Sequence, residues 1–199
     1  MRSIFYSNIH LYRLMVRLMY GTEYDLRYQR IADQVPAKAT VLEVCCGDCY
    51  LYLKYLNKKN ILYRGIDANN IFLNYARKKQ VRVIKGDIRK SIKFPPSDVV
   101  ILQASLYQFI PDQEIILNKL LKLARKKLII SEPVVNFGSS NNLFIRNIAD
   151  KLSQPGIEIS PYRFNRDKLL SLVDNYKQYN PKIIEPLNSR EIIIVFKIK

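Results

Sequence analysis

Two spacings of hydrophobic residues divide the chain into an N-terminal helical part and a longer mixed part. Residues Asn8–Tyr20 are apolar apart from one narrow stripe formed by His10, Arg13 and Arg17, and this pattern predicts an amphipathic helix. A second helix is predicted over about Tyr24–Gln34, since apolar residues recur there at helical spacing and a proline follows. Residues 1–35 are therefore expected to form a helical lid over a site elsewhere in the chain.

From residue 40 onward, short apolar runs typical of strands alternate with helical patterns. Near the C-terminus, a helix at about Asp167–Tyr176 precedes two strand-like runs, and the Asn-Ser pair between these runs predicts an antiparallel hairpin. The whole pattern predicts an α/β fold with a doubly wound, mostly parallel seven-stranded sheet and an antiparallel last strand. The expected strands are 40–44, 61–66, 81–86, 98–102, 127–131, 183–184 and 191–198, and the expected helices between them are 50–60, 71–79 and 112–124.

The length of 199 residues corresponds to one domain. We expect a single domain over residues 1–199, with the lid at 1–35 and an insert on the substrate side at 133–165. The insert interrupts the alternation of strands and helices and contains one short helical pattern, LFIRNIADKL.

The composition narrows the cellular setting. All three cysteines lie within residues 45–49, so a disulfide framework is not expected and a reducing cytoplasm is. A metal site is not expected, because the chain has a single histidine to complete one. Neither a signal peptide nor a membrane span is predicted, since arginines interrupt the apolar N-terminal run.

The loop after the first predicted strand is the first candidate for chemistry, because ligands of open α/β sheets bind at the carboxyl ends of the strands. The segment VLEVCCGDC, residues 41–49, resembles the first motif of the class I S-adenosylmethionine (SAM)-dependent methyltransferases, an acidic residue followed by alternating glycines. Asp67 matches the acid that holds the ribose in that family, and Gly86-Asp87-Ile88 resembles its adenine-binding motif. The resemblance implies a Rossmann-like methyltransferase fold with SAM held by Glu43, Cys45, Cys46, Gly47, Asp48, Asp67, Ala68, Asp87, Ile88 and Gln103.

The loop departs from the family pattern at two positions. Cys45 and Cys49 stand where glycines are usual, and a non-glycine residue at positive φ costs about 1 kcal/mol or more. The loop charges favour SAM over a dinucleotide, because Glu43 and Asp48 flank the loop with no Lys or Arg between them. Two carboxylates repel a pyrophosphate and attract the ammonium and sulfonium groups of SAM. Asp67 also has a simpler interpretation, as a strand-end acid that caps the next helix.

The catalytic group is not evident from the sequence. The candidates are Tyr107, Glu132 and His10, and their simpler interpretations are a pocket wall, a turn cap and a surface residue, with the first and last of these favoured. Methyl transfer from a sulfonium is an in-line displacement, and holding donor and acceptor collinear and dry supplies most of the barrier reduction without a dedicated base.

The acceptor is expected to be a small, apolar or lipid- or quinone-like molecule, because the lid and the insert are rich in Leu, Ile, Phe and Tyr. The N-terminal helix, through Arg13 and Arg17, could also make a peripheral membrane contact. Two alternatives remain open, namely a catalytically silent SAM-binding partner protein and an RNA methyltransferase. The net charge of +16 suits nucleic acid, anionic lipid or an acidic ligand alike. The RNA alternative rests on 14 tyrosines that can stack on bases and on the basic cluster Arg77, Lys78, Lys79, Arg82, Lys85, Arg89 and Lys90.

Overall fold

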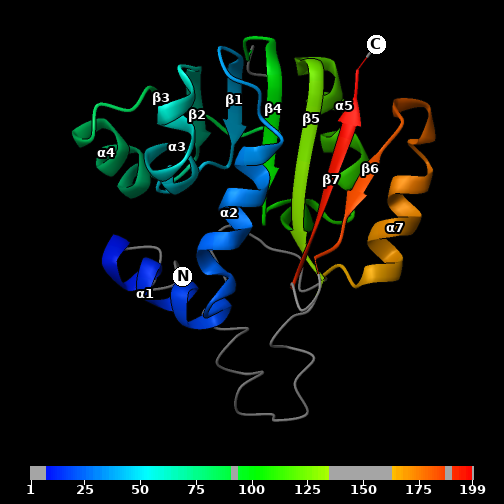
Figure 1. Ribbon diagram of the computed structural model, residues 1–199, viewed down its shortest axis with the longest axis horizontal. Helices are drawn as coiled ribbons and strands as arrows, with labels where there is room; N and C mark the ends of the chain where they lie inside the picture. The colour runs from blue at the N-terminus through cyan, green and yellow to red at the C-terminus, as the bar shows by residue number, and fades with distance from the viewer. Residues whose placement is uncertain (1–7, 91–93, 135–162, 187–189, 199) are drawn as a thin grey trace.

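The computed structural model describes residues 8–90, 94–134, 163–186 and 190–198, and its centre is a single seven-stranded sheet. The strand order is β3-β2-β1-β4-β5-β7-β6, and β7 runs antiparallel to both of its neighbours (Figure 1). The predicted fold class is confirmed, including the antiparallel last strand and the terminal hairpin. The strands are β1 (Thr40–Val44), β2 (Leu62–Asp67), β3 (Val83–Lys85), β4 (Ser97–Gln103), β5 (Ala124–Pro133), β6 (Lys182–Ile184) and β7 (Glu191–Lys197).

Helices cover the two faces of the sheet and create two apolar cores. One core lies between the sheet and helices α5 and α7, and the other lies between the sheet and helices α1, α2, α3 and α4. Figure 1 shows α2 in front of the sheet and α5 behind it. The α-helices are α1 (Ile9–Tyr20), α2 (Glu23–Asp33), α3 (Tyr50–Lys54), α4 (Asn70–Lys78), α5 (Gln113–Leu123) and α7 (Arg166–Asp174), and short 3-10 helices span Leu56–Lys59, Leu106–Phe109 and Lys177–Tyr179.

The N-terminal helices form as the pattern predicts, with one difference in which side chains are buried. The Asn8 side chain caps the first turn of α1, and Gly21 follows the helix at φ 52°, a conformation that glycine adopts without strain. In α2, however, Leu26 is exposed, and the buried face includes Tyr24, Arg27 and Tyr28. Ile31 and Val35 are buried as the spacing predicts, whereas aromatic rings and an arginine take the place expected for Leu26.

Two other elements differ from the prediction. The helix expected over residues 50–60 is the short α3 followed by a 3-10 turn, because the backbone leaves the helical region at Tyr55, φ −121°. Strand β5 is longer than expected because it pairs with β7 up to Pro133. Most of the insert predicted at 133–165, including its short helix, lies outside the described residues.

Candidate functional site

The loop between β1 and α3 turns sharply at the carboxyl end of the sheet. Cys45 has φ 55°, Gly47 has φ 53° and Cys49 has φ 56°. The two cysteines that replace glycines therefore adopt the left-handed conformation that the motif requires, and we expect their backbone to be strained. The loop is anchored to the neighbouring strand β2, where the Cys46 amide donates to the Ile66 carbonyl at 3.0 Å.

Glu43 is fully buried at the end of β1 and is held by two neutral donors. The Tyr63 hydroxyl donates to Glu43 Oε2 at 2.6 Å, and the Gln103 amide nitrogen donates to Oε1. Burial raises the pKa of Glu43 to about 7, although both hydrogen bonds oppose this shift. The Gln103 amide oxygen is buried and has no hydrogen-bond partner within the described part of the chain. Glu43 and Gln103 thus offer acceptor oxygens suited to an ammonium group.

Asp67 ends β2 and binds the same loop. One carboxylate oxygen accepts from the Gly47 amide at 2.8 Å, and the other accepts from the Asn69 amide at 2.7 Å. Burial is the main cause of the raised pKa of Asp67, against these backbone bonds. Asn69 is the N-cap of α4, so Asp67 supports the start of this helix as well as the loop. The helix-capping interpretation is thus part of its role, and contact with a ribose stays a prediction.

The segment Gly86-Asp87-Ile88, which resembles the adenine-binding motif, follows β3 directly. Asp87 binds Arg89 at 2.7 Å, and this bond lowers the pKa of the carboxyl. Ile88 is buried, whereas Ala68, after β2, is partly exposed. Gly86 is tightly enclosed, because a Cβ atom there would lie 3.1 Å from both Ile66 and Phe94. The structure therefore places the predicted cofactor residues along the carboxyl ends of β1, β2, β3 and β4, and their individual contacts with SAM stay predictions.

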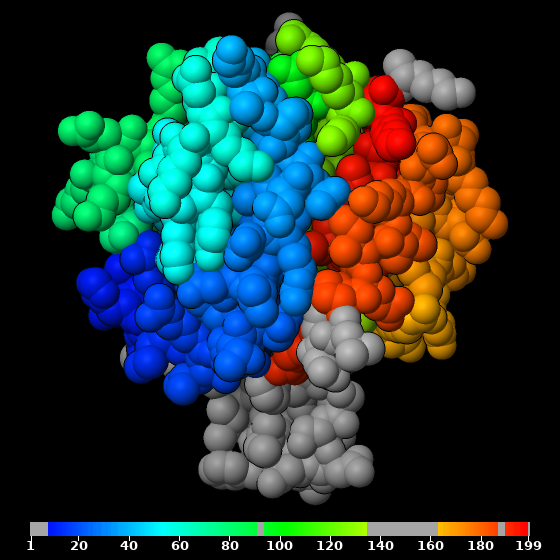
Figure 2. All heavy atoms as spheres, in the orientation of Figure 1, coloured from blue at the N-terminus to red at the C-terminus, as the bar shows by residue number. Residues whose placement is uncertain are grey.

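Helix α1 covers the loop and brings a cation that the sequence analysis missed. Arg13 Nε lies 2.5 Å from Asp48 Oδ2, and the guanidinium also stacks over the Tyr75 ring of α4 at 4.6 Å. The neighbouring Tyr12 ring packs against Phe72 of α4 at 4.9 Å. Figure 2 shows α1 (dark blue) packed against α2. The loop is consequently less negative than its sequence indicates, since Asp48 is neutralised from outside it.

Of the three candidate catalytic residues, Glu132 and Tyr107 are buried and His10 is exposed. Glu132, fully buried at the end of β5, accepts from the Leu106 amide at 2.9 Å and the Tyr107 amide at 3.4 Å. Burial raises the pKa of Glu132 to about 8 and also raises that of Tyr107. The Arg163 guanidinium lies 3.8 Å from the centre of the Tyr107 ring. His10 is exposed on the first turn of α1, so it is not part of this buried cluster.

A second polar network, which no sequence pattern indicates, lies between α2 and β7. Arg27 Nη2 is 2.7 Å from Glu191 Oε1, and the Tyr20 hydroxyl donates to the same oxygen at 2.7 Å. The Ser131 hydroxyl donates to Glu191 Oε2 at 2.7 Å. These contacts attach the first two helices to β5 and β7 through buried charges.

The described residues contain neither a metal-binding cluster nor a membrane-spanning helix. No group of three or more His, Cys, Asp or Glu there could hold a metal ion. No helix in the same part of the chain is long and apolar enough to cross a bilayer.

Comparisons with known proteins agree with this arrangement. A family model described as "Methionine biosynthesis protein MetW" matches residues 25–176, whereas no curated protein matches the sequence. A SAM-dependent methyltransferase from Thermotoga maritima, described as a possible histamine N-methyltransferase, is 16% identical over 98% of both chains, with a TM-score of 0.65. A TehB-like SAM-dependent methyltransferase from Corynebacterium glutamicum is 15% identical over 96% of both chains, with a TM-score of 0.62. Magnesium protoporphyrin IX methyltransferase from Synechocystis, solved with bound SAH, is 15% identical over 91% of this chain and 84% of that one, with a TM-score of 0.59.

Proposed function

Because the chain belongs to the MetW family and has the fold of the class I SAM-dependent methyltransferases, we propose that it transfers a methyl group from SAM to a small, largely apolar acceptor. The prediction of a SAM-dependent methyltransferase family (EC 2.1.1 type) is confirmed at the level of family and fold. The proposal adds the class of the methyl acceptor, which the family and the fold do not specify.

The residues at the carboxyl end of the sheet suit SAM. Glu43 and the unpartnered oxygen of Gln103 would hold the methionine ammonium, and Asp67 would hold the ribose. The Asp87-Ile88 pair would contact the adenine. SAM supplies an electrophilic methyl group on its sulfonium. Helix α1, fixed to the loop by Arg13, would exclude water from this end of the site.

The observation that carries the acceptor proposal is the burial and hydrogen bonding of the two candidate catalytic groups beyond the loop, Glu132 and Tyr107. Glu132 is occupied by two backbone amides and Tyr107 is buried, and the pKa of each is raised by that burial. Glu132 is fully buried with its oxygens held by backbone amides, and Tyr107 keeps its proton near neutral pH, so neither group is suited to take a proton from an acceptor. Tyr107 belongs to the apolar core, which favours an apolar acceptor beside it. The Arg163 guanidinium over the Tyr107 ring is the one cation described there, and it could orient an acceptor through one electron-rich or anionic group. Catalysis would therefore rest on positioning.

The outer face of α1 supports a weaker proposal, that of peripheral membrane contact. Met15 and Val16 face the body of the protein, whereas the side chains of Leu14 and Leu18 are 54% and 75% exposed. Packing on the domain itself thus uses one face of the helix and leaves a second apolar face available. A cytoplasmic location, with α1 in contact with the membrane surface, stays a proposal.

The acceptor class can be tested with tritium-labelled SAM. Purified protein is incubated with a cell extract and labelled SAM, and the products are separated into organic-extractable small molecules, RNA and protein. We expect the label in the organic-extractable fraction. Label confined to RNA or protein would contradict the proposal, and SAM binding without any transfer would favour the catalytically silent alternative.

The positioning role of Arg163 is tested in the same assay. Arg163→Gln should lower transfer about tenfold and leave the affinity for SAM within about twofold, because one orienting contact of 1–2 kcal/mol is lost. Arg166→Gln is the matched control, since Arg166 is exposed and pairs with Glu185 on the surface. Equal losses in the two variants would rule out a specific role for Arg163.

A further inference from the structure

One part of the sheet is left uncovered at the β3 edge. The connection from β3 to β4 contains no helix in its described residues, 86–90 and 94–96, and α5 lies over β4 and β5 instead. The face of the sheet that α5 covers elsewhere is therefore open at this edge, where Leu62 and Ile84 are 69% and 38% exposed. A groove of about 380 Å³ occupies the same edge, lined by Arg64, Val81, Arg82, Val83 and Ile84.

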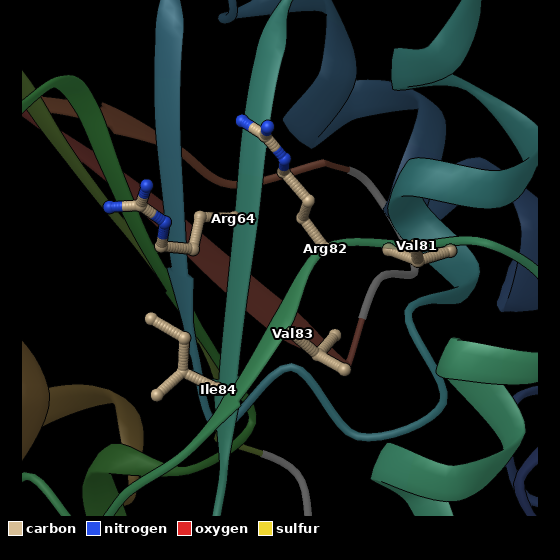
Figure 3. Close-up of a pocket in the computed structure, with 5 residues that line it drawn as sticks. All are labelled: Arg64, Val81, Arg82, Val83 and Ile84. Carbon is tan, nitrogen blue, oxygen red and sulfur yellow. The ribbon is translucent and has the colours of Figure 1, made fainter.

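The two arginines of the groove are neighbours across the sheet. Gly65 of β2 pairs with Val83 of β3, and the Gly65 amide donates to the Arg82 carbonyl at 2.9 Å, so Arg64 and Arg82 lie side by side in the parallel register. Figure 3 shows Arg64 and Ile84 extending to one side of the two strands, while Val81 and Val83 extend to the other. Neither arginine forms an ion pair with any acid in the described part of the chain. Two adjacent, unneutralised guanidinium groups on an open face attract an anion.

The positive charge around the groove is more than a single small anion would neutralise. Residues 61–90 contain eight Lys or Arg and two Asp. Of these two acids, Asp67 is half-buried and bound by the amides of Gly47 and Asn69, and Asp87 is paired with Arg89. Further exposed cations lie on α4 and around β3, at Arg77, Lys78, Lys79, Lys85 and Lys90. The ligand that matches this surface is an extended polyanion.

We propose that this groove binds a single-stranded polynucleotide, with phosphates at Arg64 and Arg82 and base faces against Leu62 and Ile84. A single strand suits the groove because its phosphates can enter the hollow and its unstacked bases can reach the aliphatic side chains. A flat lipid surface would touch the rim and leave the half-buried Arg64 without a partner. The inference goes beyond methyl transfer and does not depend on which acceptor is used.

The test measures the anisotropy of a short, fluorescein-labelled, single-stranded RNA of mixed sequence over a series of KCl concentrations. Arg64→Gln/Arg82→Gln should weaken binding at least about tenfold and reduce the slope of log K against log[salt] by about 1.4, since each phosphate contact on a single strand contributes about 0.7. Arg125→Gln/Lys182→Gln is the matched control, because it removes two exposed charges remote from the groove and should change affinity less than about twofold. Arg64→Lys/Arg82→Lys should keep most of the salt slope, because it preserves both charges.

Three results would overturn the proposal. The first is an equal loss of RNA binding in the control pair, which would mean that only net charge matters. The second is competition by ATP at the same concentration as unlabelled RNA, which would indicate a mononucleotide site. The third is binding to phosphatidylserine-containing vesicles, lost in Arg64→Gln/Arg82→Gln, together with no RNA binding. Unchanged SAM affinity in every variant separates these results from damage to the fold.

Discussion

Two buried glutamates on different halves of the sheet are stabilised in different ways. Glu43, on β1, receives hydrogen bonds from the neutral groups of Tyr63 and Gln103, and burial raises its pKa to about 7. Glu191, on β7, is 2.7 Å from the guanidinium of Arg27 and is also bound by Tyr20 and Ser131. One carboxyl is close to its protonation midpoint at neutral pH, whereas the other is neutralised by a fixed cation.

The difference separates a proposed binding position from a structural one. A carboxyl surrounded by neutral donors can respond to an incoming cation by losing its proton, so the environment of Glu43 suits the ammonium of SAM. The Glu191 network instead joins Tyr20 of α1 and Arg27 of α2 to β7, the strand next to the β6 edge of the sheet. Its charges have partners within the protein, and we expect it to hold the N-terminal helices in place whether or not a ligand is bound.

The largest expected effect comes from breaking the Glu191 network. Arg27→Met should lower the free energy of unfolding by about 3–5 kcal/mol, because it leaves a buried carboxylate without its cation. Urea denaturation of the full chain measures this loss. The control is the double variant Arg27→Met/Glu191→Met, which should recover much of the stability because no buried charge remains. A double variant as unstable as Arg27→Met would show that the arginine acts through packing alone.

A smaller effect is expected from the proton on Glu43. Its folded pKa of about 7 lies above the ordinary value of 4.5, so the folded protein binds more protons than the unfolded chain between these values. Stability contributed by the protonated carboxyl is therefore complete below pH 4.5 and is lost as pH rises to about 7, by about 3 kcal/mol in total. Urea midpoints measured across this range check the sign. Glu43→Gln should flatten the profile, and an unchanged profile would assign the slope to another group.

The smallest effect concerns the strained loop beside Glu43. Cys45→Gly should leave the free energy of unfolding unchanged or raise it by up to about 1 kcal/mol, because the left-handed backbone at φ 55° is relieved. Thermal denaturation and calorimetry with SAM measure stability and binding together. Cys46→Gly is the matched control and should destabilise by about 1–2 kcal/mol, because Cys46 is buried and does not have positive φ. A folded Cys45→Gly variant with much weaker SAM binding would show that the thiol itself contributes.

The Glu43 region could be predicted from the sequence, because most of the residues that form it lie within short segments of the chain. The strand periodicity, the small-residue loop and the acid at the end of the next strand all lie within short segments, and the left-handed cysteines follow from their positions in the motif. The mostly parallel sheet could be inferred too, since strands that alternate with helices favour parallel pairing, whereas the strand order comes from the structure. What the sequence does not show for this region is Arg13, which comes to Asp48 from another helix.

The Glu191 region could not be predicted, because it depends on distant residues meeting. Arg27 reads as a polar position of an amphipathic helix, and Glu191 reads as the first residue of an edge strand. Only the fold places β7 inside the sheet and α2 against it, which buries both charges. Leu26 shows the same limit, since helical spacing favoured its burial and the rings of Tyr24 and Tyr28 occupy that interface instead.

The position of β7 constrains the order in which the chain can acquire its structure. Strand β6 leaves the ribosome before β7, yet β7 is the strand that pairs with β6 and joins it to β5. During synthesis, the growing chain therefore carries a β5 edge and an unpaired β6 until residues 191–197 have emerged and inserted between them. Such exposed edges are the sites at which partly folded chains associate with one another. Insertion of β7 thus joins β6 to the rest of the sheet, covers the β5 edge and buries Glu191.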